Sequence, residues 1–477
     1  MLRKTFQQFP LARPYLIATA VCILLFWPTW FRLIQEWLKW EQVLAHGLPT
    51  FLIFLGLLVV HPPRPRISGP RGSPIVGGSL LLLAVVGWAL LELVRIDTLA
   101  YLMLPPGLLL VCWTLYGLRA AVAFLPHVLL LSLSLPIWAD MVPFLVELAS
   151  VVVGDLVGLL GITALIEGAN ITLPYGRLVI ADGCSGIRYL AVSILLGMIT
   201  AILNDFRWKG WLAAITTSVL LALIINWVRI TALVLIAYYS NMESDLVTEH
   251  ETFGWLVFAA FVIPVMLLAP VHRRTPAPVG ATMPTSGKPF IFIVAGLLIG
   301  PLGISIAHSA ATQSPPWAPS NSDLTAEDPD RLPLAVRLPA HMEHDVWRST
   351  DGHWISLGQS VRSASNEKLV PYLPRPLDTG NWFLAEEHGQ PPIRIYQNLA
   401  SRQQVAVYQH YLVGRYRANS YWTAKLLQIP ATLQGQGRFA FLTLQAPCGP
   451  RDCAQAIDRL TRQIEGGVVT TDIRSAP

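Results

Sequence analysis

Long runs of apolar residues recur along the first 310 residues, and they constrain the fold more than any other feature of the chain. A helix needs about 20 mostly apolar residues to cross the hydrocarbon core of a bilayer, and several runs approach this length. Of all 477 residues, 53% are hydrophobic and only 13% are charged, whereas soluble domains average about 25% charged residues. Because one globule cannot bury so much apolar surface, the sequence predicts a polytopic α-helical membrane protein.

We expect about eight or nine transmembrane helices. The first apolar run resembles a signal peptide, but it ends at Trp27–Trp30 without a small-residue cleavage site, which indicates an uncleaved helix. The nine candidate spans are residues 13–30, 43–60, 75–94, 98–117, 120–138, 184–203, 211–238, 253–271 and 289–308.

Basic residues between these spans predict the orientation. Five groups of basic residues fall on one side if the spans alternate, and the cytoplasmic side carries the excess of Lys and Arg. The groups are Arg3, Lys4 and Arg13; Arg64, Arg66 and Arg71; Arg119; Arg207 and Lys209; and His272, Arg273, Arg274 and Lys288. The N-terminus is then cytoplasmic and residues 309–477 lie outside. Orientation also explains the net charge of +5, so we expect no nucleic-acid partner.

Residues 142–166 are apolar and long enough to cross, but they contain Glu147 and Asp155. A crossing here would also break the charge pattern downstream. We therefore favour an interfacial or re-entrant helix. Residues 171–181 alternate around a Pro-Tyr-Gly turn and predict a small β-hairpin that leads to Cys184.

The composition changes after the ninth span. Residues 314–330 form a linker rich in Pro, Ser and Asp. Alternating runs such as 403–414 and 438–446 then predict a soluble α+β domain that lies outside the cell membrane.

The cysteines differ in setting. Cys22 and Cys112 lie in apolar helices, where a thiol usually acts as a small apolar filler. Cys448 and Cys453 lie in the outer domain, in PCGPRDC, whose spacing is too wide for C-x-x-C. A local disulfide is the expected state in an oxidising compartment. We find no metal-ligand cluster in the sequence and expect neither a metal nor a cofactor.

Cys184 stands among small residues in IADGCSGIRYL, at the outer end of the sixth span. A helix N-terminus favours a thiolate there, and Arg188 adds positive charge one turn further on. The alternative is a structural cysteine between glycines that serve helix packing.

Two later spans carry the other reactive side chains. Asn226 and Arg229 share one face of the seventh span, and arginine at membrane depth normally faces a polar cavity or a partner. His250 lies in the outer loop before the eighth span. Taken singly, Arg229 could be a snorkelling side chain and His250 an ordinary surface histidine. His127, in the fifth span, is interpreted as packed or pore-lining.

Together, Cys184, Arg229 and His250 project to the outer face from three consecutive spans. A cysteine nucleophile with a histidine acid/base suffices for thiol acyl chemistry. Arginine suits the stabilisation of an oxyanion or the anchoring of a carboxylate.

The residues Cys-Ser-Gly at 184–186, Asn-x-x-Arg-Ile at 226–230 and His250 with a following Gly-Trp resemble the exosortase/archaeosortase signature, over roughly residues 15–275. The resemblance implies that Cys184, Arg229 and His250 are catalytic. From their positions in the sequence, Arg188 and Asn226 are the expected supporting residues. It implies substrates that are secreted proteins with a C-terminal signal of a short Pro-containing motif, a membrane helix and a basic tail. It also implies the bacterial inner membrane, with the active site and the C-terminal domain on the periplasmic side.

The outer domain is similar to the exopolysaccharide-associated domain found beside or fused to exosortases, on the basis of its placement and Trp/Tyr/Arg-rich stretches such as 408–422. The implied organisation is a multi-spanning catalytic domain (1–275), the ninth span with its linker (276–329) and the outer domain (330–477). Membrane lipid and exopolysaccharide machinery are the further expected partners.

The leading hypothesis is therefore a membrane-embedded cysteine transpeptidase. Water as the acceptor would make it a simple protease. From another class, a non-enzymatic component of exopolysaccharide biosynthesis or export stays open, with the outer domain as its working part. A glycosyl-transfer or polymerase role lacks the large outer loop with paired carboxylates that it would need.

The orientation is testable with topology reporters. A reporter fused after Asp205 should read cytoplasmic, and one fused after Pro315 should read extracytoplasmic, because the basic groups all fall on one side. Paired alkaline phosphatase and fluorescent-protein fusions at each site measure this. The same answer at both sites would contradict the scheme.

Overall fold

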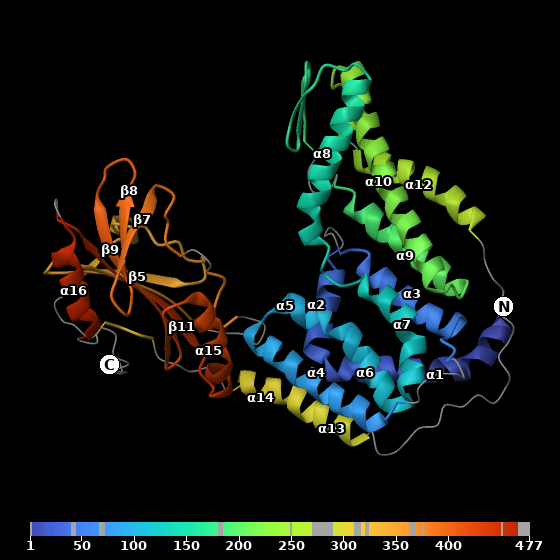
Figure 1. The fold of residues 1–477 in the computed structure, drawn as a ribbon, viewed down its shortest axis with the longest axis horizontal. Coiled ribbons are helices and arrows are strands. Elements are labelled where there is room, and N and C mark those ends of the chain that lie inside the picture. The colour runs from blue at the N-terminus through green and yellow to red at the C-terminus, as the bar shows by residue number, and fades with distance from the viewer. Residues whose placement is uncertain are drawn as a thin grey trace. The chain divides into compact units, whose positions relative to one another are not determined.

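The computed structural model describes most of the chain and divides into two compact units (Figure 1). The described residues are 2–39, 44–65, 72–179, 185–248, 250–269, 290–309, 316–319, 324–361, 368–373, 376–449 and 452–465. The first unit contains residues 1–88 and 97–301, and the second contains residues 89–96 and 302–477.

The part of the chain before residue 310 is mostly helical. Its helices are α1 (Leu2–Leu25), α2 (Trp27–Trp37), α3 (Gly47–Val60), α4 (Pro74–Val94), α5 (Asp97–Leu102), α6 (Leu104–Tyr116), α7 (Leu118–Ser132), α8 (Val142–Leu159), α9 (Ile187–Leu203), α10 (Trp208–Tyr239), α11 (Asp245–Thr248), α12 (His250–Leu268), α13 (Phe290–Leu297) and α14 (Gly303–Ser309), with a π-helical turn at Leu298–Leu302. Within the described residues, six helical segments are long and apolar enough to cross a membrane.

These helices make the chain a multi-pass membrane protein, but they do not confirm a count of eight or nine spans. The first expected span is broken, because α1 and α2 meet at an angle of 98°. Pro28 lies in the first turn of α2, where proline fits a helix start. Three other expected spans, Gly47–Val60, Leu118–Ser132 and Ile187–Leu203, form helices of 14, 15 and 17 residues. They are shorter than the roughly 20 residues that a straight crossing needs.

Helix α8 covers most of the segment that the sequence left open. It is a regular helix of 18 residues and one of the six candidates by length and composition. It lies alongside α10 (Figure 1), with Val153 and Val157 in one apolar cluster with Ile230 and Val234. Helix α9 instead contacts an earlier part of α10, through Tyr189 against Ile225. Helices α9 and α8 thus occupy successive lengths of α10, which favours different depths for the two; the interfacial placement of α8 stays a prediction.

A three-stranded antiparallel sheet follows α8, in the order β1 (Leu165–Glu167), β2 (Asn170–Leu173) and β3 (Gly176–Val179). The predicted hairpin is confirmed: Leu173 pairs with Gly176 across the turn. Strand β1 is an addition that the sequence analysis missed. Ile171 and Leu173 join the apolar cluster of α8 and α10, so the sheet packs on these helices.

The second unit contains an eight-stranded antiparallel sheet in the order β4-β5-β6-β11-β9-β8-β7, with β10 beside β9. The elements are β4 (Leu324–Glu327), β5 (Glu343–Ser349), β6 (Trp354–Val361), β7 (Trp382–His388), β8 (Ile393–Asn398), β9 (Gln404–Val413), β10 (Tyr416–Ala418), α15 (Tyr421–Leu433), β11 (Arg438–Pro447) and α16 (Ala454–Glu465). The two alternating runs named from the sequence are β9 and β11. Side chains alternate across β11: Leu442 and Leu444 pack in a cluster with α16, and Phe439 and Phe441 in a cluster with α15.

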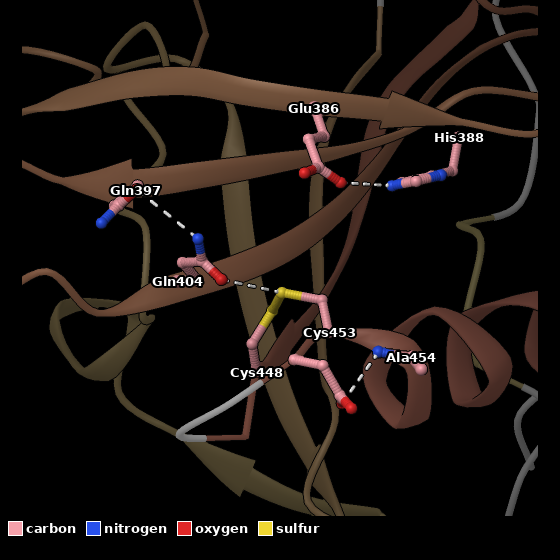
Figure 2. Close-up of a disulfide and its surroundings, with 8 residues drawn as sticks. Glu386, His388, Gln397, Gln404, Cys448, Cys453 and Ala454 are labelled. Atoms are coloured by element: carbon pink, nitrogen blue, oxygen red, sulfur yellow. Dashed lines mark hydrogen bonds and ion pairs between the residues drawn. A yellow bond between two sulfur atoms is a disulfide. The ribbon is translucent and has the colours of Figure 1, made fainter.

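Cys448 and Cys453 form a disulfide at the end of β11, just before α16 (Figure 2). Gln404 of β9 lies beside this bridge, and the backbone N–H of Ala454 donates to Asp452 at 3.3 Å. The bridge therefore joins the central strand of the sheet to the start of the last helix. The described thiols Cys22 and Cys112 are both buried and unbridged.

The disulfide can be checked by peptide mapping, because trypsin cleaves after Arg451, between the two cysteines. Without reduction, the peptides that carry Cys448 and Cys453 should elute as one linked pair, and reduction should separate them. Mass spectrometry of freshly purified protein measures this, with alkylated Cys22 as an internal control for free thiols. Two separate alkylated peptides in unreduced protein would contradict the bridge.

Candidate functional site

Arg229 lies at the centre of the candidate site. Its side chain is only 1% exposed, although α10 is an apolar helix. Its Nη2 donates a hydrogen bond to the backbone oxygen of His250 at 3.0 Å, and its guanidinium lies 5.4 Å from the ring centre of Tyr189. Arg229 therefore ties α10 to the start of α12 and to the first turn of α9.

Two other nitrogens of the Arg229 guanidinium, Nε and Nη1, are buried and have no hydrogen-bond partner among the described residues. Among these residues Arg229 also forms no salt bridge. Buried donors that lack a partner are costly, especially on a charged group. The arrangement suits an incoming oxygen that carries negative charge, such as a carboxylate or the oxyanion of an acyl-transfer intermediate.

Gly254 makes room for the guanidinium. A Cβ atom at this position would lie 2.2 Å from the Tyr189 hydroxyl and 2.4 Å from Nε of Arg229. Gly254 stands four residues after His250, on the same face of α12. The sequence analysis used Gly254 only as part of a motif, although its spacing of four residues from His250 already indicated that the two share a helix face. It missed Tyr189 altogether.

Asn226 supports the turn that begins α9. Gly186 precedes this helix with φ +79°, a left-handed conformation that glycine adopts at little cost. A Cβ on Gly186 would lie 2.6 Å from Cγ of Asn226, which is itself buried. The turn follows directly on Cys184 in the chain. Asn226 therefore packs against this turn, and Arg229, three residues further along α10, lies close to it.

Cys184 itself lies outside the described residues, which resume at Ser185. Ser185 is buried, and its hydroxyl accepts a weak hydrogen bond from the N–H of Ile187 at 3.4 Å. The position of the thiol relative to Arg229 and His250 thus stays a prediction. His250 contacts Arg229 through its backbone carbonyl, and its imidazole forms no hydrogen bond to a described residue.

Arg188 is paired with Glu251. Its Nη1 lies 3.6 Å from a carboxylate oxygen of Glu251, and both side chains are partly exposed. We expected Arg188 to add positive charge near the thiol. Glu251 offsets that charge.

A small pocket opens beside the guanidinium. Its lining residues are Gly186, Arg188, Tyr189, Arg229, Glu251 and Trp255. Its volume of about 10 Å³ is roughly what one water molecule needs. Trp255 is 44% exposed and meets the Tyr189 ring edge-on at 5.5 Å. A substrate would therefore have to displace Trp255 or part the Arg188–Glu251 pair to reach Arg229.

No group of three or more potential metal ligands occurs among the described residues. The groups that form the site are the Arg229 guanidinium, the His250 backbone carbonyl, the rings of Tyr189 and Trp255, and the turn that follows Cys184.

The apolar helices and this polar site between α9, α10 and α12 define a multi-pass membrane protein with a polar centre inside its helical bundle. Residues 37–267 match the family model described as transmembrane exosortase, and this part of the chain belongs to that family. The match includes Cys184, Arg229 and His250 and stops before the second β-sheet. Searches of curated proteins and of solved structures each found no match.

The close approach at Gly254 is testable by substitution. Gly254→Ala should lower the melting temperature of the detergent-solubilised protein, because overpacking typically costs about 1–3 kcal/mol. Gly87→Ala in α4 is the matched control, because a Cβ there meets no atom within 4 Å. The control should leave the melting temperature unchanged or raise it slightly, since alanine favours helices. Equal melting temperatures for the two variants would contradict the packing at Gly254.

Proposed function

We propose that the protein is a membrane-embedded cysteine transpeptidase that cleaves C-terminal sorting signals of secreted proteins near the periplasmic face of the inner membrane and transfers the acyl group to an acceptor. The observation that carries the proposal is the buried guanidinium of Arg229, which has two unpartnered N–H donors beside the turn that follows Cys184. Membership of the transmembrane exosortase family supports a sorting enzyme.

In the first half-reaction, His250 takes the proton of the Cys184 thiol, and the thiolate attacks the carbonyl carbon of the scissile peptide bond. The carbonyl oxygen becomes an oxyanion in the tetrahedral intermediate. The C–N bond then breaks, and His250 returns its proton to the leaving nitrogen. The products are a thioester on Cys184 and the released membrane helix with its basic tail.

In the second half-reaction, a nucleophile on the acceptor attacks the thioester carbonyl. His250 takes the proton of that nucleophile, the C–S bond breaks, and the thiol is restored. Water in place of the acceptor would give hydrolysis by the same steps. The same catalytic residues would therefore serve both transpeptidation and hydrolysis, and the identity of the acceptor decides which reaction occurs.

Arg229 would supply Nε–H or Nη1–H to the oxyanion, because these two donors lie on different edges of the planar guanidinium and a single oxygen can meet only one of them. Its Nη2 bond to the His250 carbonyl and its contact with the Tyr189 ring hold the guanidinium plane before substrate arrives. Donors fixed in this way stabilise developing charge without reorganising during the reaction. The surrounding apolar helices exclude water and strengthen the interaction.

A membrane-tethered substrate fits the position of the site. A helix in the bilayer would bring the peptide bond just outside it to the outer ends of α9 and α12. The small pocket beside Arg229 opens there between Trp255 and the Arg188–Glu251 pair. On this proposal, substrate binding widens that opening.

The second unit is proposed as the exopolysaccharide-associated domain on the periplasmic side. Its β-rich fold is compatible with an independent outer domain, and its Trp/Tyr/Arg-rich stretch at 408–422 is the feature that supports a polysaccharide-linked role. Secreted proteins with tripartite sorting signals, membrane lipid and exopolysaccharide machinery are the proposed partners.

The mechanism is tested by three substitutions and a membrane-tethered substrate whose shortening is followed by immunoblot. Cys184→Ala and His250→Ala should abolish cleavage. Arg229→Lys should slow it by about a hundred- to a thousandfold, the usual cost of losing an oxyanion donor. Lysine keeps the charge but lacks the planar fork of donors.

Arg462→Lys is the matched control, because Arg462 is exposed and pairs with Asp458 at 2.8 Å, away from the candidate site. It should cleave at the wild-type rate. All variants should accumulate in the membrane at similar levels. Full cleavage by Cys184→Ala would end the thiol mechanism and favour a non-enzymatic export component. Wild-type cleavage by Arg229→Lys would show that Arg229 is structural.

A further inference from the structure

A large cavity among the described residues lies away from Arg229 and has no part in the proposed chemistry. Its volume is about 840 Å³, within the roughly 300–1,000 Å³ typical of ligand pockets. Three segments that are distant in sequence form it: the chain after α3, the first half of α7, and the turn between α9 and α10. We call it the arginine cavity.

Charge in the arginine cavity is strongly biased. Arg64, Arg119 and Arg207 line it, against one carboxylate, Asp205. That carboxylate lies 3.5 Å from Nε2 of His61. The lining thus carries three guanidinium groups from three segments and one acid.

Two helix N-termini add to this bias. Helices α7 and α10 begin at Leu118 and Trp208, and both residues line the cavity. The N-cap residues are Gly117 and Arg207, and neither has a side-chain acceptor for the N–H groups of the first turn. The N-terminus of a helix favours anions through its free N–H groups and its dipole. The guanidiniums and these helix ends together point to a phosphate-bearing ligand.

The remaining lining is apolar or aromatic. Leu118, Val122, Leu125, Ile202 and Phe206 supply a wall suited to acyl chains. Trp208 and Trp211 line the cavity too, and tryptophan prefers the boundary between lipid and water. This combination favours an amphipathic ligand over a soluble phosphate compound.

The position of the cavity along α10 fits a membrane surface. Arg207 precedes Arg229 by 22 residues, which is about 33 Å along a helix at 1.5 Å per residue. The hydrocarbon core is about 30 Å thick. The arginine cavity and the Arg229 site therefore lie at opposite faces of the bilayer. Arg64, Arg119 and Arg207 also belong to the basic groups that predict the cytoplasmic side, where anionic lipids attract such clusters.

We propose that the arginine cavity binds the phosphate headgroup of an anionic phospholipid, with its acyl chains along the apolar wall. Bound lipid would link the chain after α3 to α7 and to the start of α10. His127, buried at the cavity, would serve as part of its floor, where its Nε2 lies 3.1 Å from the carbonyl oxygen of His61. His127 has no part in the proposed enzyme chemistry, and its place in the cavity lining accounts for it.

The test uses the full-length protein in detergent and short-chain phosphatidylglycerol, with short-chain phosphatidylcholine as the zwitterionic comparison. Native mass spectrometry measures the bound lipid. The wild-type protein should bind phosphatidylglycerol at least tenfold more tightly than phosphatidylcholine. Equal binding of the two lipids would overturn the proposal without any variant.

The variant Arg119→Gln/Arg207→Gln should weaken phosphatidylglycerol binding at least tenfold. Arg13→Gln is the matched control: Arg13 is an exposed arginine of α1, in another basic group of the same predicted side, and it does not line the cavity. The control should bind like the wild type. Equal losses in both variants would mean general attraction to a basic surface and would overturn the site.

A third arm separates lipid from a soluble ligand. Glycerophosphoglycerol carries the same phosphodiester headgroup without acyl chains, and it should compete with phosphatidylglycerol only at far higher concentration. Competition at equal concentration would overturn the lipid assignment. Circular dichroism of each variant without lipid checks that the helices are retained, so that lost binding is not lost folding.

Discussion

The burial of one positive charge in an apolar helix organises the membrane part of this protein. Arg229 is nearly inaccessible to solvent, and burying a charge is costly unless it is paired and hydrogen-bonded. Three helices share the compensation: α10 carries the guanidinium, α9 presents the face of the Tyr189 ring, and α12 offers the His250 carbonyl. Among the described residues this compensation is partial, and under the proposed mechanism a reacting oxygen would accept from one of the two donors left over.

Small residues make this arrangement possible, because a guanidinium and an aromatic ring need space beside a helix backbone. Gly254 leaves that space on α12, and Gly186 lets the turn before α9 rest on Asn226. Since Asn226 and Arg229 belong to the same helix, the turn after Cys184 and the guanidinium are held by one rigid element. A shift of α10 would therefore disturb the proposed nucleophile and the proposed oxyanion donors together.

Helix α10 also connects the two ends of the helical bundle. With 32 residues it is about 48 Å long, which exceeds the roughly 30 Å of the hydrocarbon core. Its first turn borders the arginine cavity, its middle packs on α9, and the part after Arg229 packs on α8 and the small sheet. Lipid at one end and substrate at the other would thus act on the same helix, which offers a physical route by which membrane composition could influence the site.

The sequence by itself determined what depends on local pattern. Apolar runs predicted a multi-pass membrane protein, alternation predicted β9 and β11, and the three-residue spacing of Asn226 and Arg229 placed them on one helix face. The family motifs likewise lie in single short stretches. Such features follow from the periods of helices and strands, which can be read along the chain.

Only the tertiary structure decided which groups meet. It broke the first expected span between α1 and α2, paired Arg188 with Glu251, and chose the His250 carbonyl as the partner of Arg229. It also assembled the arginine cavity from segments up to about 150 residues apart. The physical reason is that these contacts arise from packing between segments that are distant in sequence. The local periodicity of a helix or strand does not indicate which distant residue will be the partner.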